Sequence, residues 1–257
     1  MEFKLIKFEK KDKVSRIRLS TPPLNVMNIA MMKEINEALA DIKKDTSLKA
    51  LIFDHEGEKA FSAGVDVADH TEEKVDEMLE VFHRIFRNLS EIDIPTFAIV
   101  DGVALGGGCE LVSFCDVVVA SERSRIGQPE ITVGTYPPVA VPLFPYLFGL
   151  RRTYELLLSG KVIDAKEAER IGLVTVVLPV EDFRENAERY IREQYLGKSK
   201  AVLCWTKRAI KACLGVPFLE GLRTSEIIYR YGLMSTYDAK EGLRAFLEKR
   251  KPEWKDE

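Results

Sequence analysis

The sequence has few of the residues that build metal centres, disulfide frameworks and membrane spans. Its 257 residues include three histidines and four cysteines, with no CxxC pair and no zinc-like spacing of Cys and His. No apolar run approaches the ~20 residues that a membrane span needs, and the first residues lack the apolar core of a signal peptide. We therefore expect a cytoplasmic protein with reduced thiols, no metal site and no membrane partner.

The chain also lacks a large excess of either positive or negative charge. The chain carries 38 Lys and Arg against 41 Asp and Glu, a net charge of −3. A general nucleic-acid-binding protein usually has a basic balance, so we expect no nucleic-acid partner. Apolar residues make up 46% of the chain, which is ordinary for a globular protein with a sizeable core.

Segments with strand and helix patterns alternate along the first three quarters of the chain, which predicts an α/β fold over residues 1–195. Strand patterns occupy residues 3–8, 14–19, 50–53, 96–100 and 116–120, and residues 10–13 form a turn. Helical patterns occupy residues 27–43, 71–89, 139–148, 151–159, 164–171 and 181–195. Residues 196–257 are almost entirely helical in pattern. Their apolar faces must pack on the core or on another subunit.

Two glycine-containing loops are candidates for ligand contact. Residues 60–66 read AFSAGVD, and small residues let a backbone turn bring its N–H groups close to a ligand. A simple strand-to-helix loop is the alternative. Residues 101–110 read DGVALGGGCE, with three glycines opening a helix after a buried strand. This segment is neither GxGxxG nor a P-loop, so an oxyanion hole fits it better than a nucleotide cradle.

Two glutamates are candidates for acid–base chemistry. Glu110 lies in an apolar stretch directly after the glycines, where a carboxylate is costly unless it is paired or functional. Pro129 precedes Glu130 and stiffens its loop. The two carboxylates could divide the roles of acid and base. A capping or ion-pairing role for Glu110 is the alternative, and the spacing leaves open whether the pair meets in space.

The histidines and serines give no catalytic pattern. His55, His70 and His83 lack metal-ligand spacing, and we interpret them as surface or packing residues. His70 follows the first glycine loop and could line a pocket. The absence of a GxSxG motif disfavours a serine hydrolase.

Taken together, AFSAGVD, DGVALGGGCELVSFCDVVVAS and IGQPEITVGTYP resemble the crotonase superfamily, the enoyl-CoA hydratase/isomerase family. The N-terminal PPLNVMN and the C-terminal EGLRAFLEKRKPEWKD resemble further landmarks of the family. The resemblance covers essentially the whole chain in order. It implies a crotonase-like spiral of ββα units, followed by a helical C-terminal region that builds homotrimers, often paired into homohexamers.

The resemblance also implies the roles of individual residues. The backbone N–H groups of Val65 and Gly107 would form the oxyanion hole for a thioester carbonyl, and Glu110 and Glu130 would act on water and on the carbon acid. No cofactor is implied, because coenzyme A is part of the acyl-CoA substrate. The backbone of Leu24, Asn25 and Val26 would meet the adenine, and Phe246 and Lys249 would reach the CoA nucleotide, usually of a neighbouring subunit. The remaining residues that would bind substrate or CoA are Ala63, Gly64, Asp66, Val67, Leu105, Gly106, Pro129, Val133, Gly134 and Tyr136.

Two segments depart from the common pattern of the family. After Gly134, a glycine-rich P-G-x-G-G segment is replaced by YPPVAVP at residues 136–142, and residues 66–70 read DVADH. Both departures resemble hydratases of cyclohexa-1,5-diene-1-carbonyl-CoA, which yield 6-hydroxycyclohex-1-ene-1-carbonyl-CoA in anaerobic benzoyl-CoA degradation. Alternatives are a short-chain enoyl-CoA hydratase or isomerase, a thioester hydrolase using the same oxyanion hole, and a crotonase-like RNA-binding or scaffolding protein without catalysis.

Overall fold

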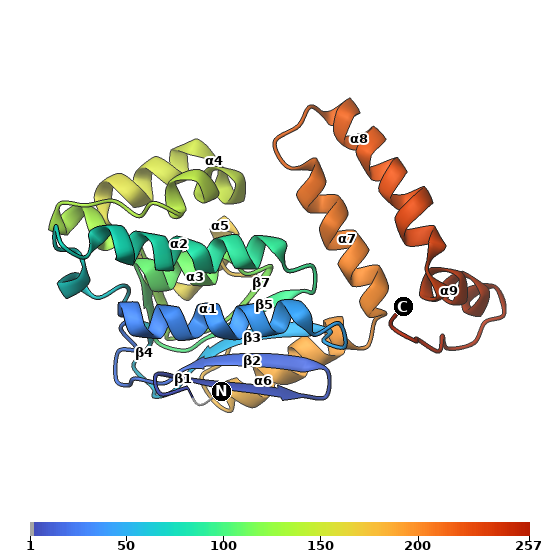
Figure 1. Cartoon of the computed structure of the whole chain (residues 1–257), viewed down its shortest axis with the longest axis horizontal. Coiled ribbons are helices and arrows are strands. Elements are labelled where there is room, and N and C mark those ends of the chain that lie inside the picture. Colours follow the sequence, from blue (N-terminus) through green and yellow to red (C-terminus); the bar gives the residue numbers. More distant parts are fainter. Residues whose placement is uncertain (1–2) are drawn as a thin grey trace. The chain divides into compact units, whose positions relative to one another are not determined.

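The computed structural model describes residues 3–257, which form two compact units. The larger unit runs up to Glu91 and continues over Thr96–Glu188, and the smaller one comprises Ile92–Pro95 and Arg189–Glu257. The larger unit is built of strands and helices, and the smaller unit is helical (Figure 1). The predicted α/β architecture is therefore confirmed.

A six-stranded sheet forms the centre of the larger unit. Its order is β1-β2-β3-β5-β7-β10, with an antiparallel β1–β2 hairpin and parallel pairing elsewhere. Every residue of β3, β5 and β7 is buried, which explains why these strands read as continuous apolar runs. The strands are β1 (Ile6–Lys11), β2 (Val14–Leu19), β3 (Ala50–His55), β5 (Thr96–Val100), β7 (Val117–Ser121) and β10 (Val176–Leu178).

The N-terminal hairpin corrects one sequence prediction. The first strand is not residues 3–8 but Ile6–Lys11, and its turn is shorter than residues 10–13. Asp12 and Lys13 have φ angles of 51° and 65°, which is the left-handed conformation of a two-residue hairpin turn. The tighter turn lets pairing continue from Ile6 opposite Leu19 to Lys11 opposite Val14.

A second, four-stranded sheet includes parts of the two glycine-containing segments. Its order is β4-β6-β8-β9, and each strand has only three residues. No sequence pattern predicted these strands, because a strand of three residues is too short to show alternation. The first two strands also lie inside the glycine-containing segments, residues 60–66 and 101–110. The strands are β4 (Ala60–Ser62), β6 (Val103–Leu105), β8 (Arg125–Gly127) and β9 (Val162–Asp164).

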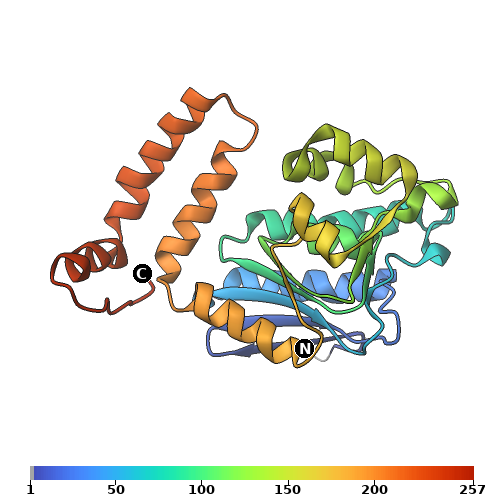
Figure 2. The ribbon, with the colours of Figure 1, turned by 180° about the vertical axis from the view of Figure 1, so that it is seen from behind.

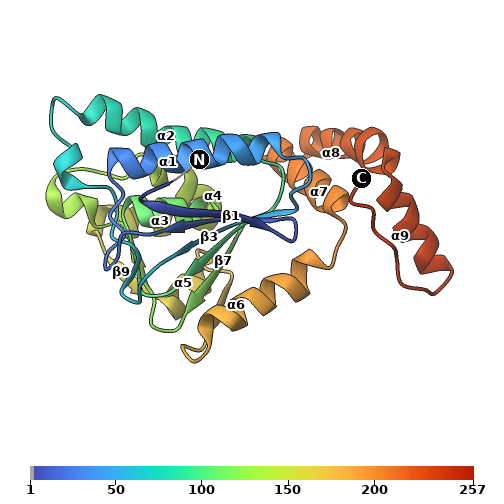
Figure 3. The ribbon, with the colours of Figure 1, turned by 60° about the horizontal axis from the view of Figure 1, so that its bottom comes forward.

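Helices cover both faces of the larger sheet. Figure 3 shows α1 (Ile29–Lys44) and α2 (Val75–Glu91) along one face, with α5 (Ala165–Ile171) and α6 (Phe183–Ile191) on the other. The apolar positions that predict α1 are all buried: Met31, Met32, Ile35, Leu39 and Ile42. The helix begins two residues later than predicted because the Asn28 side chain caps it, accepting from the Met31 amide. The remaining helices are α3 (Gly107–Phe114) and α4 (Ala140–Ser159), with the short η1 (Val67–Asp69) and η2 (Pro129–Val133).

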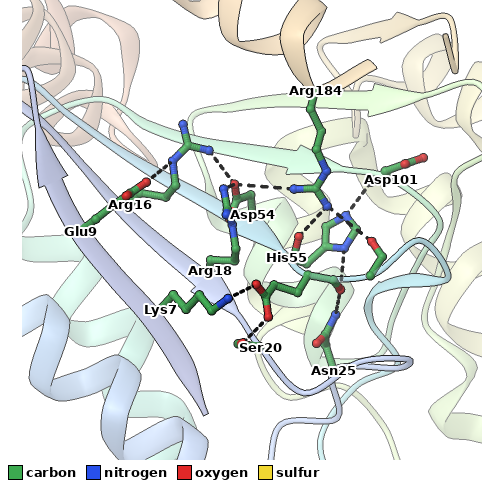
Figure 4. Close-up of polar contacts among 12 residues, drawn as sticks. Lys7, Glu9, Arg16, Arg18, Ser20, Asn25, Asp54, His55, Asp101 and Arg184 are labelled. Atoms are coloured by element: carbon green, nitrogen blue, oxygen red, sulfur yellow. Dashed lines mark hydrogen bonds and ion pairs between the residues drawn. The ribbon is translucent and has the colours of Figure 1, made fainter. Parts of the chain in front are cut away.

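A buried polar cluster fastens the loops that leave the larger sheet (Figure 4). Asp54 in β3 is 1% exposed and accepts from Arg16 at 2.5 Å and from Arg18 at 2.8 Å. The neighbouring His55 ring accepts the Asp101 amide at 3.2 Å, and Arg184 of α6 donates to the His55 carbonyl. Burial, followed by the charge of Arg184, lowers the pKa of His55 to about 4. His55 is therefore a neutral packing residue.

The smaller unit is held together around two positions. A Cβ on Gly232 would lie 2.5 Å from the Trp205 ring, so only glycine lets this tryptophan pack there. Asp238 is fully buried and accepts from Ser199 Oγ and from the backbone amides of Lys255 and Asp256, which fastens the C-terminal segment. Its elements, coloured orange to red in Figure 2, are η3 (Arg192–Leu196), α7 (Lys200–Cys213), α8 (Phe218–Ile227), η4 (Ile228–Gly232), η5 (Leu233–Ser235) and α9 (Tyr237–Leu247).

Candidate active site

Three successive glycines bring the candidate segments into contact. Strand β6 ends at Leu105, Gly106 turns the chain with φ of 52°, and α3 begins at Gly107. A Cβ on Gly106 would lie 2.8 Å from Glu130 Oε1, and one on Gly107 would lie 2.7 Å from Val65 Cγ2. A Cβ on Gly108 would lie 2.7 Å from Ser62. Residues 60–66, residues 101–110 and the loop of Glu130 therefore lie in contact. The contact is possible because residues 106–108 have no side chains.

Two backbone amides at this junction are available as donors. Val65 pairs with Met27 in an isolated parallel bridge, and Gly107 opens α3, where its amide has no partner within the helix. Within residues 3–257, neither the Val65 nor the Gly107 N–H donates a hydrogen bond. A Cβ on Gly64 would lie 3.6 Å from the Gly107 nitrogen, so the backbone that leads into Val65 runs beside the start of α3.

Glu110 is held by the start of α4. It lies in the first turn of α3 and is 2% exposed. Its Oε1 accepts the amides of Val139 at 2.7 Å and Ala140 at 2.9 Å. Burial, reinforced by the charge of Glu130, raises the pKa of Glu110 to about 7, although the two amides act in the opposite direction. A carboxyl with this pKa can gain and lose a proton near neutral pH.

Glu130 comes from a different element and faces the glycine turn. It lies in η2, directly after Pro129, which occupies the first position of that helix. Burial raises the pKa of Glu130 to about 7. In the amide orientation that satisfies both of its ends, Gln128 donates to both Glu130 oxygens, at 3.1 and 3.2 Å, and to the Gly106 carbonyl at 3.2 Å.

The two glutamates share one environment. The charge of Glu130 raises the pKa of Glu110, and both charges, after burial, raise the pKa of the Cys109 thiol, which directly precedes Glu110 in the chain. Glu110 donates its amide to the carbonyl of Gly106, and a Cβ on Gly106 would lie 2.8 Å from Glu130 Oε1. Both glutamates therefore adjoin the same glycine turn, near enough for the charge of Glu130 to act on Glu110.

The Leu24–Val26 segment runs beside the first glycine loop. Ala63 donates its amide to the Leu24 carbonyl at 2.9 Å, and Met27 donates to the Gly64 carbonyl at 2.9 Å. The Asn25 side chain is fully buried, and it bonds the backbone of Thr21, Glu56 and Ala60. Its amide therefore shapes the loop, so a ligand contact at Asn25 falls to its main chain.

The other predicted contact residues lie in three places. Val67, Val133 and Tyr136 are exposed to 72%, 70% and 64%, on η1, at the end of η2 and in the segment after it. Asp66 is used locally, since its side chain accepts the Ala68 amide. Leu105 and Gly106 form the turn into α3, and Gly134 ends η2 in a left-handed conformation. Phe246 and Lys249 belong to the smaller unit, at the end of α9.

Sequence reasoning missed the groups that hold the carboxylates. The amides of Val139 and Ala140 bind Glu110 from a segment about thirty residues away in the chain. A local sequence pattern does not predict such a contact. Gln128 had a weak signal in the sequence, because it is an amide two residues before a candidate carboxylate. The structure shows that it is only 1% exposed.

The described residues show neither a metal cluster nor a membrane-spanning helix. Residues 3–257 contain no group of three or more His, Cys, Asp and Glu side chains placed to hold a metal ion. In the same part of the chain, no helix is long and apolar enough to cross a membrane.

Comparison with known proteins identifies the family. Residues 9–257 match the family model described as enoyl-CoA hydratase/isomerase. A probable mitochondrial enoyl-CoA hydratase of Dictyostelium discoideum is 35% identical over 255 residues, covering 96% of this chain and 89% of the relative. The cyclohexa-1,5-dienecarbonyl-CoA hydratase of Thauera aromatica is 34% identical over 249 residues, covering 96% and 95%.

Solved structures agree with this result. The crystal structure of an enoyl-CoA hydratase from Bacillus anthracis superimposes with a TM-score of 0.92 at 32% identity, over 99% of this chain and 100% of that one. The chain therefore belongs to the enoyl-CoA hydratase/isomerase family and has the crotonase fold. It is an enzyme of the hydro-lyase class, and its substrate is an acyl-CoA thioester.

Proposed function

We propose that the chain adds water to the carbon–carbon double bond of an enoyl-CoA thioester at the site around Glu110 and Glu130. The observation that carries this proposal is the combination of the buried Glu110 carboxyl and the half-buried Glu130 carboxyl, each with its pKa raised to about 7, with two unengaged amides. Hydration needs a base for water, an acid for carbon and donors for the charge that develops on the thioester oxygen.

The amides of Val65 and Gly107 would bind the thioester oxygen. When water attacks the β carbon, the electrons of the double bond move toward the carbonyl, and negative charge grows on its oxygen. Fixed donors aimed at that oxygen stabilise the enolate-like transition state more than the substrate. Removing one such donor typically costs ~10²–10³ in rate.

The two glutamates would move the protons. Glu110 accepts hydrogen bonds from two fixed backbone amides, which favour its ionised form. We therefore assign Glu110 as the base that takes a proton from the attacking water. Glu130 would deliver a proton to carbon, which for a simple enoyl thioester is the α carbon. One C–O and one C–H bond form while one O–H bond of water and the π bond of the C=C break, so the reaction balances without a redox partner. Proton exchange with solvent then returns Glu110 to its ionised form and Glu130 to its protonated form before the next turnover. Every group in this scheme belongs to the chain, and we propose that no cofactor beyond the substrate's own CoA is used.

For the acyl group we propose cyclohexa-1,5-diene-1-carbonyl-CoA, giving 6-hydroxycyclohex-1-ene-1-carbonyl-CoA. Hydroxide would add β to the thioester, and the proton would add at the far end of the conjugated diene. Support comes from the relative in Thauera aromatica and from residues 136–142. This unusual segment carries the exposed Tyr136 and supplies the amides that bind Glu110.

A short-chain 2-enoyl-CoA is the second candidate substrate. The relative in Dictyostelium discoideum is named only as an enoyl-CoA hydratase at 35% identity, and a short-chain-enoyl-CoA hydratase of Clostridium acetobutylicum is 31% identical over 258 residues. These identities are similar to that of the cyclic dienoyl-CoA hydratase, so the relatives support both substrates.

The test compares the two substrates directly. The purified protein is mixed with cyclohexa-1,5-diene-1-carbonyl-CoA and, separately, with crotonyl-CoA, and products are followed by ultraviolet absorbance and mass. We expect hydration mainly of the cyclic diene, and hydration slowed by ~10²-fold or more in Glu110→Gln with either substrate. Fast hydration of crotonyl-CoA alone would replace the first candidate with the second. No hydration of either would refute the proposal.

We further propose residues 196–257 as the region that assembles a homotrimer or homohexamer. In that assembly Phe246 and Lys249 would contact the CoA nucleotide bound to a neighbouring subunit, while the backbone of Leu24, Asn25 and Val26 would contact its adenine. The exposure of Phe246, at 82%, supports an interaction beyond its own unit. We also propose a cytoplasmic location.

A further inference from the structure

The loop that carries Val65 is tied to the preceding segment of chain by its backbone. Met27 donates to the Gly64 carbonyl at 2.9 Å, and Asp66 donates to the Met27 carbonyl at 3.0 Å. These bonds lie on either side of Val65, so they set the plane of the peptide whose N–H is free. Beyond Asp66 the backbone makes no further bond to that segment within residues 3–257.

A second tie, made by a side chain, follows four residues after Val65. Asp69 is 6% exposed, and its Oδ2 accepts the Ile29 amide at 2.9 Å. Ile29 is the first residue of α1, so its amide lacks an acceptor in the helix, and the carboxylate also faces the positive end of the helix dipole. Lys74 donates to the other oxygen of Asp69 at 3.0 Å.

The carboxylate form of Asp69 is favoured in this position. Burial acts to raise the pKa of Asp69, but the Ile29 amide and the Lys74 ammonium, with a smaller contribution from His70, outweigh it and lower the pKa. Asp69 therefore stays ionised at neutral pH, and its bond to Ile29 is charge-assisted.

The chain between the two ties is a closed turn. Asp66 accepts the Ala68 amide with its side chain and the Asp69 amide with its carbonyl, at 3.0 Å in both cases. The turn therefore has little freedom of its own. Its two ends are anchored to Met27 and Ile29, two residues apart in one segment. A shift at Asp69 must pass through this turn to the peptide of Val65.

We propose that Asp69 is a positioning residue that fixes the Val65 N–H for the thioester oxygen. It acts through the turn at Asp66 and is not a catalytic residue. This inference rests on the proposed role of Val65. It assigns the oxyanion hole a side-chain support outside the glycine segments, at the point where α1 begins.

The test uses one variant, one rescue and one matched control. Asp69→Ala removes the acceptor of the Ile29 amide, and Asp69→Asn keeps an acceptor of the same length without the charge. Asn28→Ala removes the other cap at the same end of α1, the bond to the Met31 amide, but leaves the tie between Asp69 and Ile29 intact. Loosening of α1 alone would affect Asp69→Ala and Asn28→Ala alike.

We expect Asp69→Ala to lower kcat for the hydrated substrate ~10-fold or more, because misplacing a reacting group by about 1 Å can cost ~10²-fold. KM should stay within about threefold, since the lost interaction is made mainly in the transition state. Asp69→Asn should recover most of kcat, and Asn28→Ala should keep kcat within about twofold. An unchanged kcat in Asp69→Ala, or an equal loss in Asn28→Ala, would overturn the proposal.

A measurement that needs no substrate separates this inference from the proposed function. Hydrogen exchange of the Asp66 amide, which bonds the Met27 carbonyl, reports the position of the Val65 loop. We expect exchange to accelerate ~10-fold or more in Asp69→Ala and to stay near the wild-type rate in Asn28→Ala. Unchanged exchange in Asp69→Ala refutes the positioning role, even if the wild-type protein hydrates neither substrate.

Discussion

Glu130 places a carboxylate oxygen 2.8 Å from the point where a Cβ atom of Gly106 would stand. The acid–base residue and the glycine turn therefore occupy adjoining space, and neither could keep its place if residue 106 carried a side chain. The glycines have two functions here. They permit the left-handed turn into α3, and they leave room for the groups of the candidate site.

Gly106→Ala tests this close approach. The new methyl group would displace the Glu130 carboxylate, and the φ of 52° would strain the backbone. We expect kcat to fall ~10²-fold, as misplacement of a catalytic group predicts, and stability to fall by ~1–3 kcal/mol. Gly197→Ala is the control, since a Cβ there meets nothing within 4 Å and φ is −71°. A fully active Gly106→Ala would contradict the geometry.

Glu110→Gln and Glu130→Gln test the proposed proton transfers. Each replacement keeps the shape of the side chain but cannot exchange a proton. We expect each to lower kcat by ~10²–10⁴, the usual contribution of general acid–base catalysis, while circular dichroism shows an intact fold. Glu37→Gln, on the exposed side of α1, is the control. A near-wild-type rate in either variant would remove that glutamate from the mechanism.

The raised pKa of Glu110 also predicts how stability depends on pH. In the folded protein its pKa is about 7 against an ordinary value of 4.5. Between these values the folded state holds a proton that the unfolded state has lost, so stability falls as pH rises through this window. Glu110→Gln removes that loss. We expect the variant to be more stable than wild type by on the order of 2 kcal/mol at pH 8.

Urea unfolding at several pH values measures this effect. The difference between Glu110→Gln and wild type should shrink as pH falls from 7 and should level off below pH 4.5, where Glu110 is protonated in both states. A difference that does not vary with pH would mean that burial leaves the pKa of Glu110 at its ordinary value.

The sequence predicts the parts of this fold that carry long periodic patterns. The apolar spacing of α1 and the buried run of Thr96–Val100 were interpreted correctly because each element is long enough to show its period. The strands of the smaller sheet have three residues each, and pairing with distant partners defines them. Their existence depends on contacts that a local pattern does not contain.

The same division holds for the candidate site. Residue type and order identified Glu110, Glu130 and the glycines. Their meeting depends on Val139 and Ala140, which bind Glu110, and on Gln128, which bonds Glu130. Asn25 is a further example. The resemblance implied a contact through the backbone of its segment, and only the structure shows that its buried side chain holds neighbouring backbone at Thr21, Glu56 and Ala60.

Asp238→Ala tests what holds the smaller unit together. The fully buried carboxylate accepts from Ser199 Oγ and from two backbone amides of the C-terminal segment. Removing it would take the acceptor from the buried Ser199 hydroxyl, a loss that costs ~1–3 kcal/mol, and from the part-buried amides of Lys255 and Asp256. We expect residues 250–257 to become sensitive to protease and the thermal midpoint to fall. Asp256→Ala removes the acceptor of the Lys200 amide but keeps the Asp238 carboxylate, and it is the control. Equal protease resistance in wild type and Asp238→Ala would contradict this account.

Large apolar side chains on the smaller unit predict self-association. Phe218, Leu219 and Leu247 are exposed to 79%, 66% and 79%, and exposed apolar surface is typical of protein–protein contacts. We expect light scattering to give a trimer or hexamer at micromolar concentration, and Leu219→Glu to weaken the assembly because it places a charge on that surface. A wild-type monomer would contradict the assembly.

If a neighbouring subunit supplies Phe246 and Lys249 to the CoA nucleotide, dissociation has a specific kinetic signature. Leu219→Glu should raise KM for the CoA thioester, while KM for the matching pantetheine thioester, which lacks the nucleotide, should stay as in wild type. Lys249→Ala should show the same selectivity without dissociating. Loss of activity toward both thioesters in Leu219→Glu would show that assembly supports the acyl site itself, and would contradict a role limited to the nucleotide.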